Sequence, residues 1–129
     1  NIGKKDKGVL PKIFYVNWFR KDEGGNFVWP GFGENSRVLK WIFDRIEGKA
    51  SAIETPIGNL PNPNSIDIKG LNLSEGDLQK LLKVEIEGWL EEIPLIREYY
   101  RSYGNKVPKE LEDELNALTE KLRQAKKVA

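Results

Sequence analysis

Apolar residues recur at helical spacing in the middle of the chain. They lie three or four residues apart, as one face of an α-helix requires, at Val38, Leu39, Ile42, Phe43 and Ile46. Asn35 or Ser36 could cap the start of this helix, and Gly48 follows the pattern as a stop signal. The sequence therefore predicts a helix over residues 36–47.

A second helical pattern begins near Leu73 and continues to the C-terminus. Ser74 is a candidate N-cap, and Pro94 is expected to kink or split the first helical segment because it lacks a backbone N–H. Gly104 ends that segment, and Pro108 opens the last helix, whose first turns are acidic.

The last helix carries a stripe of leucines spaced four, three and four residues apart, at Leu111, Leu115, Leu118 and Leu122. We expect the stripe to pack within its own domain or in a helical hairpin. A coiled-coil dimer is less favoured, because little more than one and a half heptads are present.

The chain before residue 36 has the composition of β-strands. Lys12–Phe19 is β-branched, aromatic and nearly continuously apolar, which predicts a strand buried on both faces. A polar turn at 20–26 and a short return strand at Phe27–Trp29 complete a predicted hairpin. Residues 49–73 are rich in proline and should form an irregular connector with short extended pieces such as 65–69. These elements together indicate an α+β fold.

Composition limits the chemistry that the chain can perform. Its 129 residues include no cysteine and no histidine. This excludes disulfides, thiolate zinc sites, a Ser-His-Asp triad and any histidine-bearing metal site within the chain. The chain begins with Asn1 instead of Met, in a charged stretch without an obvious cap, so we expect a fragment or a processed chain. No segment approaches the roughly 20 apolar residues that span a membrane.

The net charge of +1 is unevenly distributed along the chain. Residues 1–49 carry ten Lys or Arg against six Asp or Glu, whereas residues 50–129 carry eleven against fourteen. A mildly basic first part is compatible with a phosphorylated ligand, but the excess is too small to indicate nucleic-acid binding.

The stretch FVWPGFGEN, Phe27–Asn35, combines large aromatic residues with glycine and proline. Such a loop suits a planar ligand. Stacking a base on an aromatic ring contributes roughly 1–3 kcal/mol whatever the base, so its identity must be read by polar groups. Gly31 and Gly33 would let the backbone approach the ligand, and the Asn35 carboxamide offers both a donor and an acceptor. Phe32 and Phe19 could supply the two faces of the slot, and Phe27 could close its side.

Structural alternatives exist for the same residues. An aromatic cluster at a hairpin is most often a small core, and an asparagine before a helix is most often an N-cap. The two roles of Asn35 compete for one side-chain oxygen. If Asn35 binds a ligand, Ser36 must cap the helix, or the first N–H groups must face ligand or water.

Three long blocks then indicate a family: VNWFRK, WPGFGENSRVL and RIEGKA, within Leu10–Ala50. Through them the chain closely resembles the C-terminal part of the GTP-dependent phosphoenolpyruvate carboxykinases. TPIGNLP, at Thr55–Pro61, continues the resemblance, and the closing helices are similar in kind. The resemblance implies part of a mixed α/β nucleotide-binding domain, with its guanine-binding part in residues 1–72 and its C-terminal helices in residues 73–129.

The resemblance also implies a ligand for the loop. Phe19 and Phe32 match the aromatic residues that sandwich the guanine of GTP or GDP in that family. Phe27 matches the aromatic residue at the side of the base, and Asn35 matches the asparagine that hydrogen-bonds its edge.

In the family reaction, oxaloacetate is decarboxylated and the enolate is phosphorylated by GTP, which yields phosphoenolpyruvate, carbon dioxide and GDP. The family uses Mn²⁺ at the active site and Mg²⁺ as the second divalent ion, on the nucleotide. The phosphate-binding loop, reactive cysteine, lid and metal ligands of the family lie upstream of the matched region. The resemblance therefore implies no catalytic residue and no metal ligand in this chain, which should be inactive alone. It implies a cytoplasmic, monomeric enzyme without nucleic-acid or membrane partners.

Two alternatives stay open at this point. The chain could be a stand-alone purine-binding or regulatory module without catalysis, and tight guanine-selective binding by the isolated chain would favour that hypothesis. We expect weak or no binding, because the phosphates have no cradle here. The aromatic hairpin could instead bind single-stranded nucleic acid, but the near-neutral charge and the acidic helices argue against this.

Overall fold

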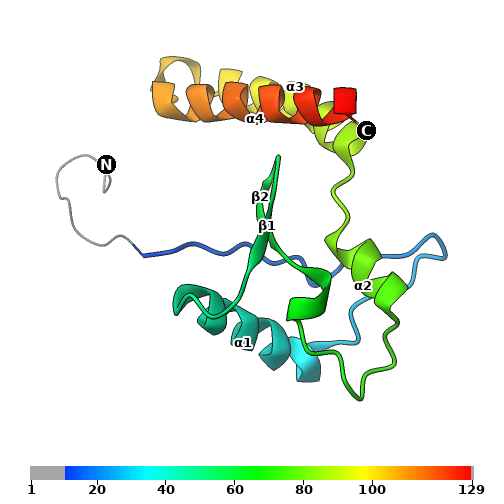
Figure 1. The fold of residues 1–129 in the computed structure, drawn as a ribbon. Coiled ribbons are helices and arrows are strands. Elements are labelled where there is room, and N and C mark those ends of the chain that lie inside the picture. The colour runs from blue at the N-terminus through cyan, green and yellow to red at the C-terminus, as the bar shows by residue number, and fades with distance from the viewer. Residues whose placement is uncertain (1–10, 129) are drawn as a thin grey trace. The chain divides into compact units, whose positions relative to one another are not determined.

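The fold is described here for residues 11–128 of a computed structural model, so the opening stretch in which we expected the start of a fragment lies outside the described residues. The chain divides into two compact units, whose elements are traced in Figure 1. The first unit comprises the chain up to Ala52 together with Pro61–Leu81. The second comprises Ile53–Leu60 and the chain from Leu82 onward. The assignment of residues 1–72 and 73–129 to parts of one larger domain stays a prediction.

Helix α1, Asn35–Ile46, is the main element of the first unit and confirms the helix predicted from the apolar spacing. A 3-10 helix at Phe32–Glu34 leads directly into it. Gly48 ends the helix with a φ of 75°, a left-handed conformation that glycine adopts without strain. The predicted side-chain cap is wrong: Glu34 is the N-cap residue, and no side chain caps the first turn.

The predicted strand at Lys12–Phe19 is also wrong, because this segment forms no ladder with any described part of the chain. It keeps the alternation of an extended chain, in which Phe14, Val16 and Trp18 are half-buried while the residues between them are exposed. Ile13 and Tyr15 are 93 % and 97 % exposed. A strand needs a hydrogen-bonding neighbour, and composition alone does not provide one.

The predicted hairpin exists in a reduced form around a single antiparallel bridge between Lys21 and Phe27. Its turn is polar and glycine-containing, as expected. The return segment Phe27–Trp29 forms no regular strand beyond that bridge.

Two tryptophans, an isoleucine and a leucine form the buried core of the first unit: Trp29, Trp41, Ile66 and Leu78. Phe14 meets the ring of Trp41 edge-on, with ring centroids 6.3 Å apart. The Leu78 side chain comes from α2, Glu75–Leu82. The Ser74 hydroxyl accepts a hydrogen bond from the Asp77 N–H at 3.1 Å, which confirms the predicted cap of this helix.

The second unit contains all but the two outermost residues of a β-hairpin, which lies within the region expected to be irregular. Strands β1, Ala52–Thr55, and β2, Gly58–Pro61, form a two-stranded sheet. The Thr55 hydroxyl donates to the carbonyl oxygen of Gly58 at 2.7 Å and so closes the turn. Pro56, one of the prolines that suggested an irregular connector, forms the two-residue turn of this hairpin with Ile57.

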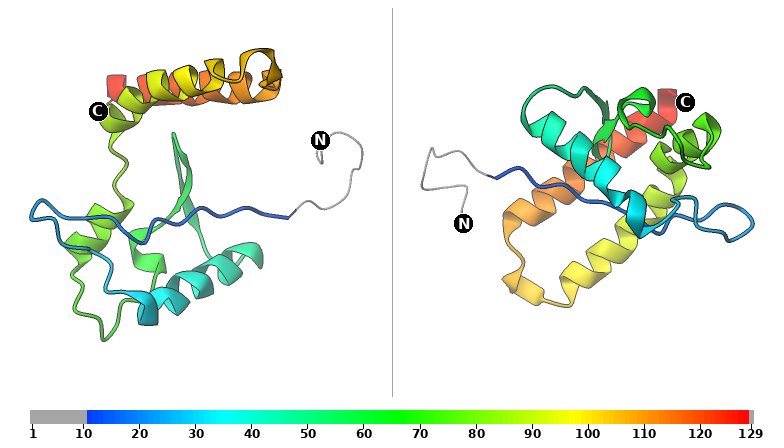
Figure 2. Two further views of the ribbon diagram at one scale, coloured as in Figure 1. Left: turned by 180° about the vertical axis from the view of Figure 1, so that it is seen from behind. Right: turned by 90° about the horizontal axis from the view of Figure 1, so that it is seen from below.

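Helices α3, Ile86–Arg101, and α4, Lys109–Val128, lie side by side (Figure 2). They are antiparallel, because Lys126 pairs with Glu87 at 2.9 Å near one end and Arg97 donates to Asn116 at 2.7 Å farther along. The leucine stripe of α4 faces α3: Leu115 and Leu122 are buried with Ile93, and Leu118 packs against them. The predicted helical hairpin is therefore confirmed.

Helix α3 continues through Pro94. The helical segment is divided earlier, at residues 83–85 between α2 and α3, so the predicted split at the proline is wrong. No helix among residues 11–128 is long and apolar enough to cross a membrane.

Candidate functional site

The candidate site begins with the hairpin that carries Phe19 and Phe27. The Val28 N–H donates to the Arg20 carbonyl oxygen at 2.9 Å, next to the bridge between Lys21 and Phe27. The Asp22 carboxylate accepts from the Asn26 N–H at 2.8 Å and holds the turn. This backbone hydrogen bond lowers the pKa of Asp22 below its ordinary value.

Phe19 and Phe27 lie together on this hairpin. Their ring centroids are 6.0 Å apart at an interplanar angle of 65°, and the Lys21 ammonium lies 5.1 Å from the centre of the Phe27 ring. Phe19 follows an Asx turn in which its N–H donates to the Asn17 side-chain oxygen at 3.0 Å. The structure therefore brings together two of the three phenylalanines predicted to contact the base.

Phe32 and Asn35 lie one turn apart on the 3-10 helix that leads into α1. The Asn35 N–H donates to the Phe32 carbonyl oxygen. Side chains three residues apart eclipse one another on a 3-10 helix, so Phe32 and Asn35 occupy the same side of this turn. Gly31 precedes the turn with φ 128° and ψ −173°, a region that is essentially restricted to glycine.

The Asn35 side chain is held by a residue that the sequence did not indicate. The Trp29 indole N–H donates to Asn35 Oδ1 at 2.8 Å. Trp29 is buried and packs on Trp18, with ring centroids 6.2 Å apart. Because Oδ1 binds the indole, Asn35 does not use its side chain as an N-cap. Its Nδ2 group and the second lone pair of Oδ1 are left for a ligand.

The three phenylalanines are far more exposed than is usual for this residue type: Phe19 is 71 %, Phe27 57 % and Phe32 91 % exposed. The prediction that they form a small core of the hairpin does not fit these exposures, since Trp29 is the buried residue of the loop. Exposed aromatic rings gathered on one loop are typical of a surface that binds a ligand or a partner. In the described structure, no ring contact joins Phe32 to Phe19 or Phe27, so the structure does not bring Phe32 together with the other two predicted rings.

The two glycines of the loop differ in their constraints. Gly31 requires its positive φ, whereas Gly33 has no positive φ, and an added Cβ would meet nothing within 4 Å. The fold of the described chain therefore explains glycine at position 31 and leaves position 33 open to close approach by a ligand.

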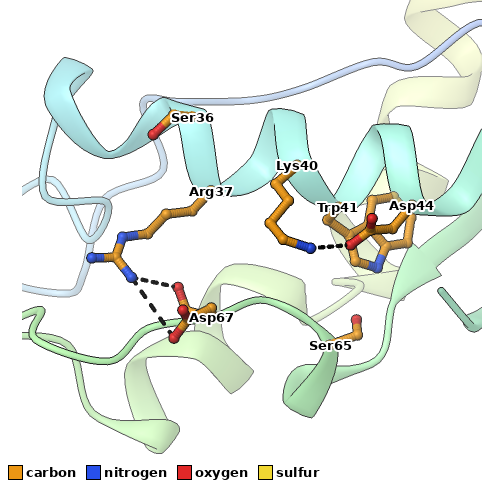
Figure 3. A pocket seen from close by; sticks show the side chains of 7 residues that line it. All are labelled: Ser36, Arg37, Lys40, Trp41, Asp44, Ser65 and Asp67. Atoms are coloured by element: carbon orange, nitrogen blue, oxygen red, sulfur yellow. Dashed lines mark hydrogen bonds and ion pairs between the residues drawn. The ribbon is translucent and has the colours of Figure 1, made fainter. Parts of the chain in front are cut away.

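A separate polar hollow of about 330 Å³ lies against α1 and was not predicted (Figure 3). It is lined by Ser36, Arg37, Lys40, Trp41, Asp44, Ser65 and Asp67, and none of the four predicted guanine-contacting residues is among them. The spacing of the polar residues at 37, 40 and 44 on one helical face is the signal that could have revealed it.

Opposite charges neutralise one another in this hollow. Arg37 donates to the Asp67 carbonyl oxygen at 2.9 Å and lies 3.8 Å from the Asp67 carboxylate. Lys40 pairs with Asp44 one helical turn away (Figure 3), and this carboxylate raises the Lys40 pKa above its ordinary value. The Trp41 indole N–H is buried and has no hydrogen-bond partner among residues 11–128. Because two cations face two carboxylates, the hollow has no net charge with which to attract a phosphate.

The described residues 11–128 bring no three potential metal-ligating side chains together. The chain also has no histidine and no cysteine. The divalent ions that the family resemblance implies therefore do not fit the residues described here.

Comparisons with known proteins identify the family. The sequence model described as "Phosphoenolpyruvate carboxykinase C-terminal P-loop domain" matches residues 1–121. The chain is 52 % identical over 123 residues to "Phosphoenolpyruvate carboxykinase [GTP]" of Neocallimastix frontalis. The aligned region covers 95 % of this chain and 20 % of that protein. It is also 52 % identical over 115 residues to the protein of the same name from Chlamydia felis, and this aligned region covers 88 % of this chain and 19 % of that protein. The chain thus spans about a fifth of the length of these relatives. It belongs to the GTP-dependent phosphoenolpyruvate carboxykinase family and corresponds to the C-terminal part of its members.

Proposed function

We propose that this chain is the guanine-recognition segment of an enzyme that converts oxaloacetate and GTP to phosphoenolpyruvate, GDP and carbon dioxide. In this reaction the C–C bond to the departing carboxylate breaks, and the enolate oxygen takes the γ-phosphoryl group from GTP. The observation that carries the proposal is the family match over residues 1–121, at 52 % identity to relatives of that name.

The proposed role of the chain is to hold the base. Phe19 and Phe32 stack on the two faces of guanine, Phe27 closes the side of the slot, and Asn35 hydrogen-bonds the edge. The exposures of the three rings and the position of Asn35 one 3-10 turn after Phe32 support this assignment. Gly31 and Gly33 bracket Phe32 and keep the backbone accessible to the base.

Phosphoryl transfer depends mainly on positioning and on electrostatic stabilisation of the phosphates. A base held by rigid aromatic walls fixes one end of GTP, so groups outside this chain can align the γ-phosphoryl group with the enolate. We assign the Mn²⁺ and Mg²⁺ ligands and all catalytic residues to the remaining part of the polypeptide. When bound, these ions neutralise phosphate charge and polarise the substrate oxygens.

The remaining assignments follow from this proposal. Both units of the chain belong to the nucleotide-binding domain, and the enzyme acts as a monomer in the cytoplasm. Its partners are GTP and oxaloacetate or phosphoenolpyruvate, without nucleic acid or membrane.

The test uses a polypeptide in which this chain replaces the matching C-terminal fifth of the Neocallimastix frontalis protein. Substituting Asn35→Ala removes the group that reads the base edge but retains the aromatic walls. We expect kcat/KM for GTP to fall and the preference for GTP over ATP to shrink by roughly 5- to 150-fold, corresponding to about 1–3 kcal/mol for a bidentate base contact. An unchanged nucleotide preference would contradict the assigned role.

Asn64→Ala is a matched control, because Asn64 is also in the first unit but at a distance in sequence from the loop. Its side chain is not part of the proposed slot. We expect it to retain the nucleotide preference of the parent polypeptide.

A further inference from the structure

The hydrogen bond between Trp29 and Asn35 connects the buried part of the loop to the group proposed to read the base. An indole N–H can only donate. It therefore requires the oxygen of the Asn35 carboxamide, at 2.8 Å, on its side. If the amide turned over, its NH₂ group would face the indole N–H, and two donors would oppose one another.

Packing keeps the indole from following such a turn. Trp29 is 6 % exposed and is packed against Trp18. A buried donor without an acceptor is disfavoured by about 5- to 150-fold in population. The Asn35 amide is thus restricted to one orientation before any ligand arrives.

The order of donor and acceptor on an amide determines which purine it can pair with. The guanine edge presents an acceptor, O6, beside a donor, N1–H. The adenine edge presents the reverse, an amino donor beside the N1 acceptor. With one Oδ1 lone pair bound by Trp29, the second lone pair can accept from N1–H of guanine while Nδ2 donates to O6. Adenine would need the opposite amide orientation, which the indole opposes.

We propose that Trp29 is a specificity-determining positioning residue, which selects guanine over adenine by fixing the orientation of the Asn35 carboxamide. This inference rests on the proposed guanine slot and adds the reason for its selectivity. Trp29 itself does not touch the base.

The test uses the polypeptide in which this chain replaces the matching C-terminal fifth of the Neocallimastix frontalis protein, called the parent chain below. The isotope-labelled parent chain is titrated with GMP and with AMP by NMR. The two nucleotides carry the same phosphate, so the ratio of their dissociation constants reports on the base alone, and millimolar affinities can be measured. We expect the parent chain to bind GMP at least tenfold more tightly than AMP. In Trp29→Phe, which retains a ring but lacks the N–H, we expect this ratio to fall to about three or less, because the amide becomes free to turn.

Trp18→Phe is the matched control, since it removes the same ring volume from the same cluster and leaves the Trp29–Asn35 bond in place. It should keep the ratio of the parent chain. An unchanged ratio in Trp29→Phe overturns the inference. If Asn35→Ala then lowers the ratio, only the inference about Trp29 fails. If Asn35→Ala also leaves the ratio unchanged, the proposed guanine slot fails as well. The slot fails too if the parent chain shows no preference for GMP.

A second measurement requires no substitution and therefore no refolding of a variant. A scalar coupling across the hydrogen bond, between Trp29 Nε1 and Asn35 Cγ, should be present in the free chain and persist with GMP bound. Loss of this coupling on GMP binding overturns the inference, because the amide would then read the base without the indole.

Discussion

Gly31 offers a direct test of how the loop is built. Its φ of 128° and ψ of −173° lie in a region that other residues enter at a cost of about 1–3 kcal/mol. An added Cβ would meet no atom within 4 Å, so the expected cost of Gly31→Ala is backbone strain without a steric clash. For a small unit with a urea m-value of about 1 kcal/mol/M, a loss of about 2 kcal/mol lowers the unfolding midpoint by about 2 M.

The assay is urea unfolding of the 129-residue chain followed by tryptophan fluorescence. Trp18, Trp29 and Trp41 all belong to the first unit, so the signal reports mainly on the unit that contains the loop. Gly33→Ala is the matched control, because Gly33 has no positive φ and equally open space around an added Cβ. We expect Gly33→Ala to change stability by less than about 0.5 kcal/mol. Equal midpoints for the two variants would refute the strain argument.

Three further predictions concern the site and the two units. Gly33→Ala, although neutral for stability, should weaken GMP binding in an NMR titration, because the added Cβ would occupy space proposed for the base. An unchanged affinity would show that the base does not approach Gly33. Leu122 is fully buried, so Leu122→Ala should destabilise the second unit by about 2–5 kcal/mol in urea unfolding followed by circular dichroism. Leu111→Ala, at a 46 % exposed position of the same helix, should cost less than about 1 kcal/mol, and similar losses would contradict the packing of α4 on α3. Hydrogen bonds from Ser74 lower the pKa of Asp77 below its ordinary value of 3.8. The ionised Asp77 carboxylate therefore stabilises the folded chain above pH 3.8, and this stabilisation is lost as the pH falls through the lowered pKa. The stability difference between the parent chain and Asp77→Asn should therefore close in acid, and a difference that persists well below pH 3.8 would contradict this linkage.

Helices were predictable because their signals are local. The spacing of apolar residues determined α1 closely, and the Ser74 cap and the leucine stripe of α4 were found where expected. Strands depend on hydrogen-bonding partners, which local sequence does not specify. Lys12–Phe19 has strand composition but no described neighbour, whereas β1 and β2 pair across a turn whose proline had suggested an irregular connector.

The candidate site was predictable in its residue types and less so in its connections. Aromatic and glycine content indicated a loop suited to a planar ligand, and the structure leaves Phe19, Phe27 and Phe32 exposed. The bond from Trp29 to Asn35 joins residues six positions apart through a turn that depends on Gly31. The periodicity of the sequence does not predict such a contact, because the contact depends on the backbone geometry of the whole loop.

The most direct test of guanine recognition is the set of intermolecular nuclear Overhauser effects between GMP and the labelled chain. We expect contacts from the guanine H8 and ribose H1′ protons to the rings of Phe19 and Phe32, and none to the polar hollow around Lys40 and Ser65. Contacts to the hollow without contacts to these rings would contradict the claim that Phe19 and Phe32 hold the base.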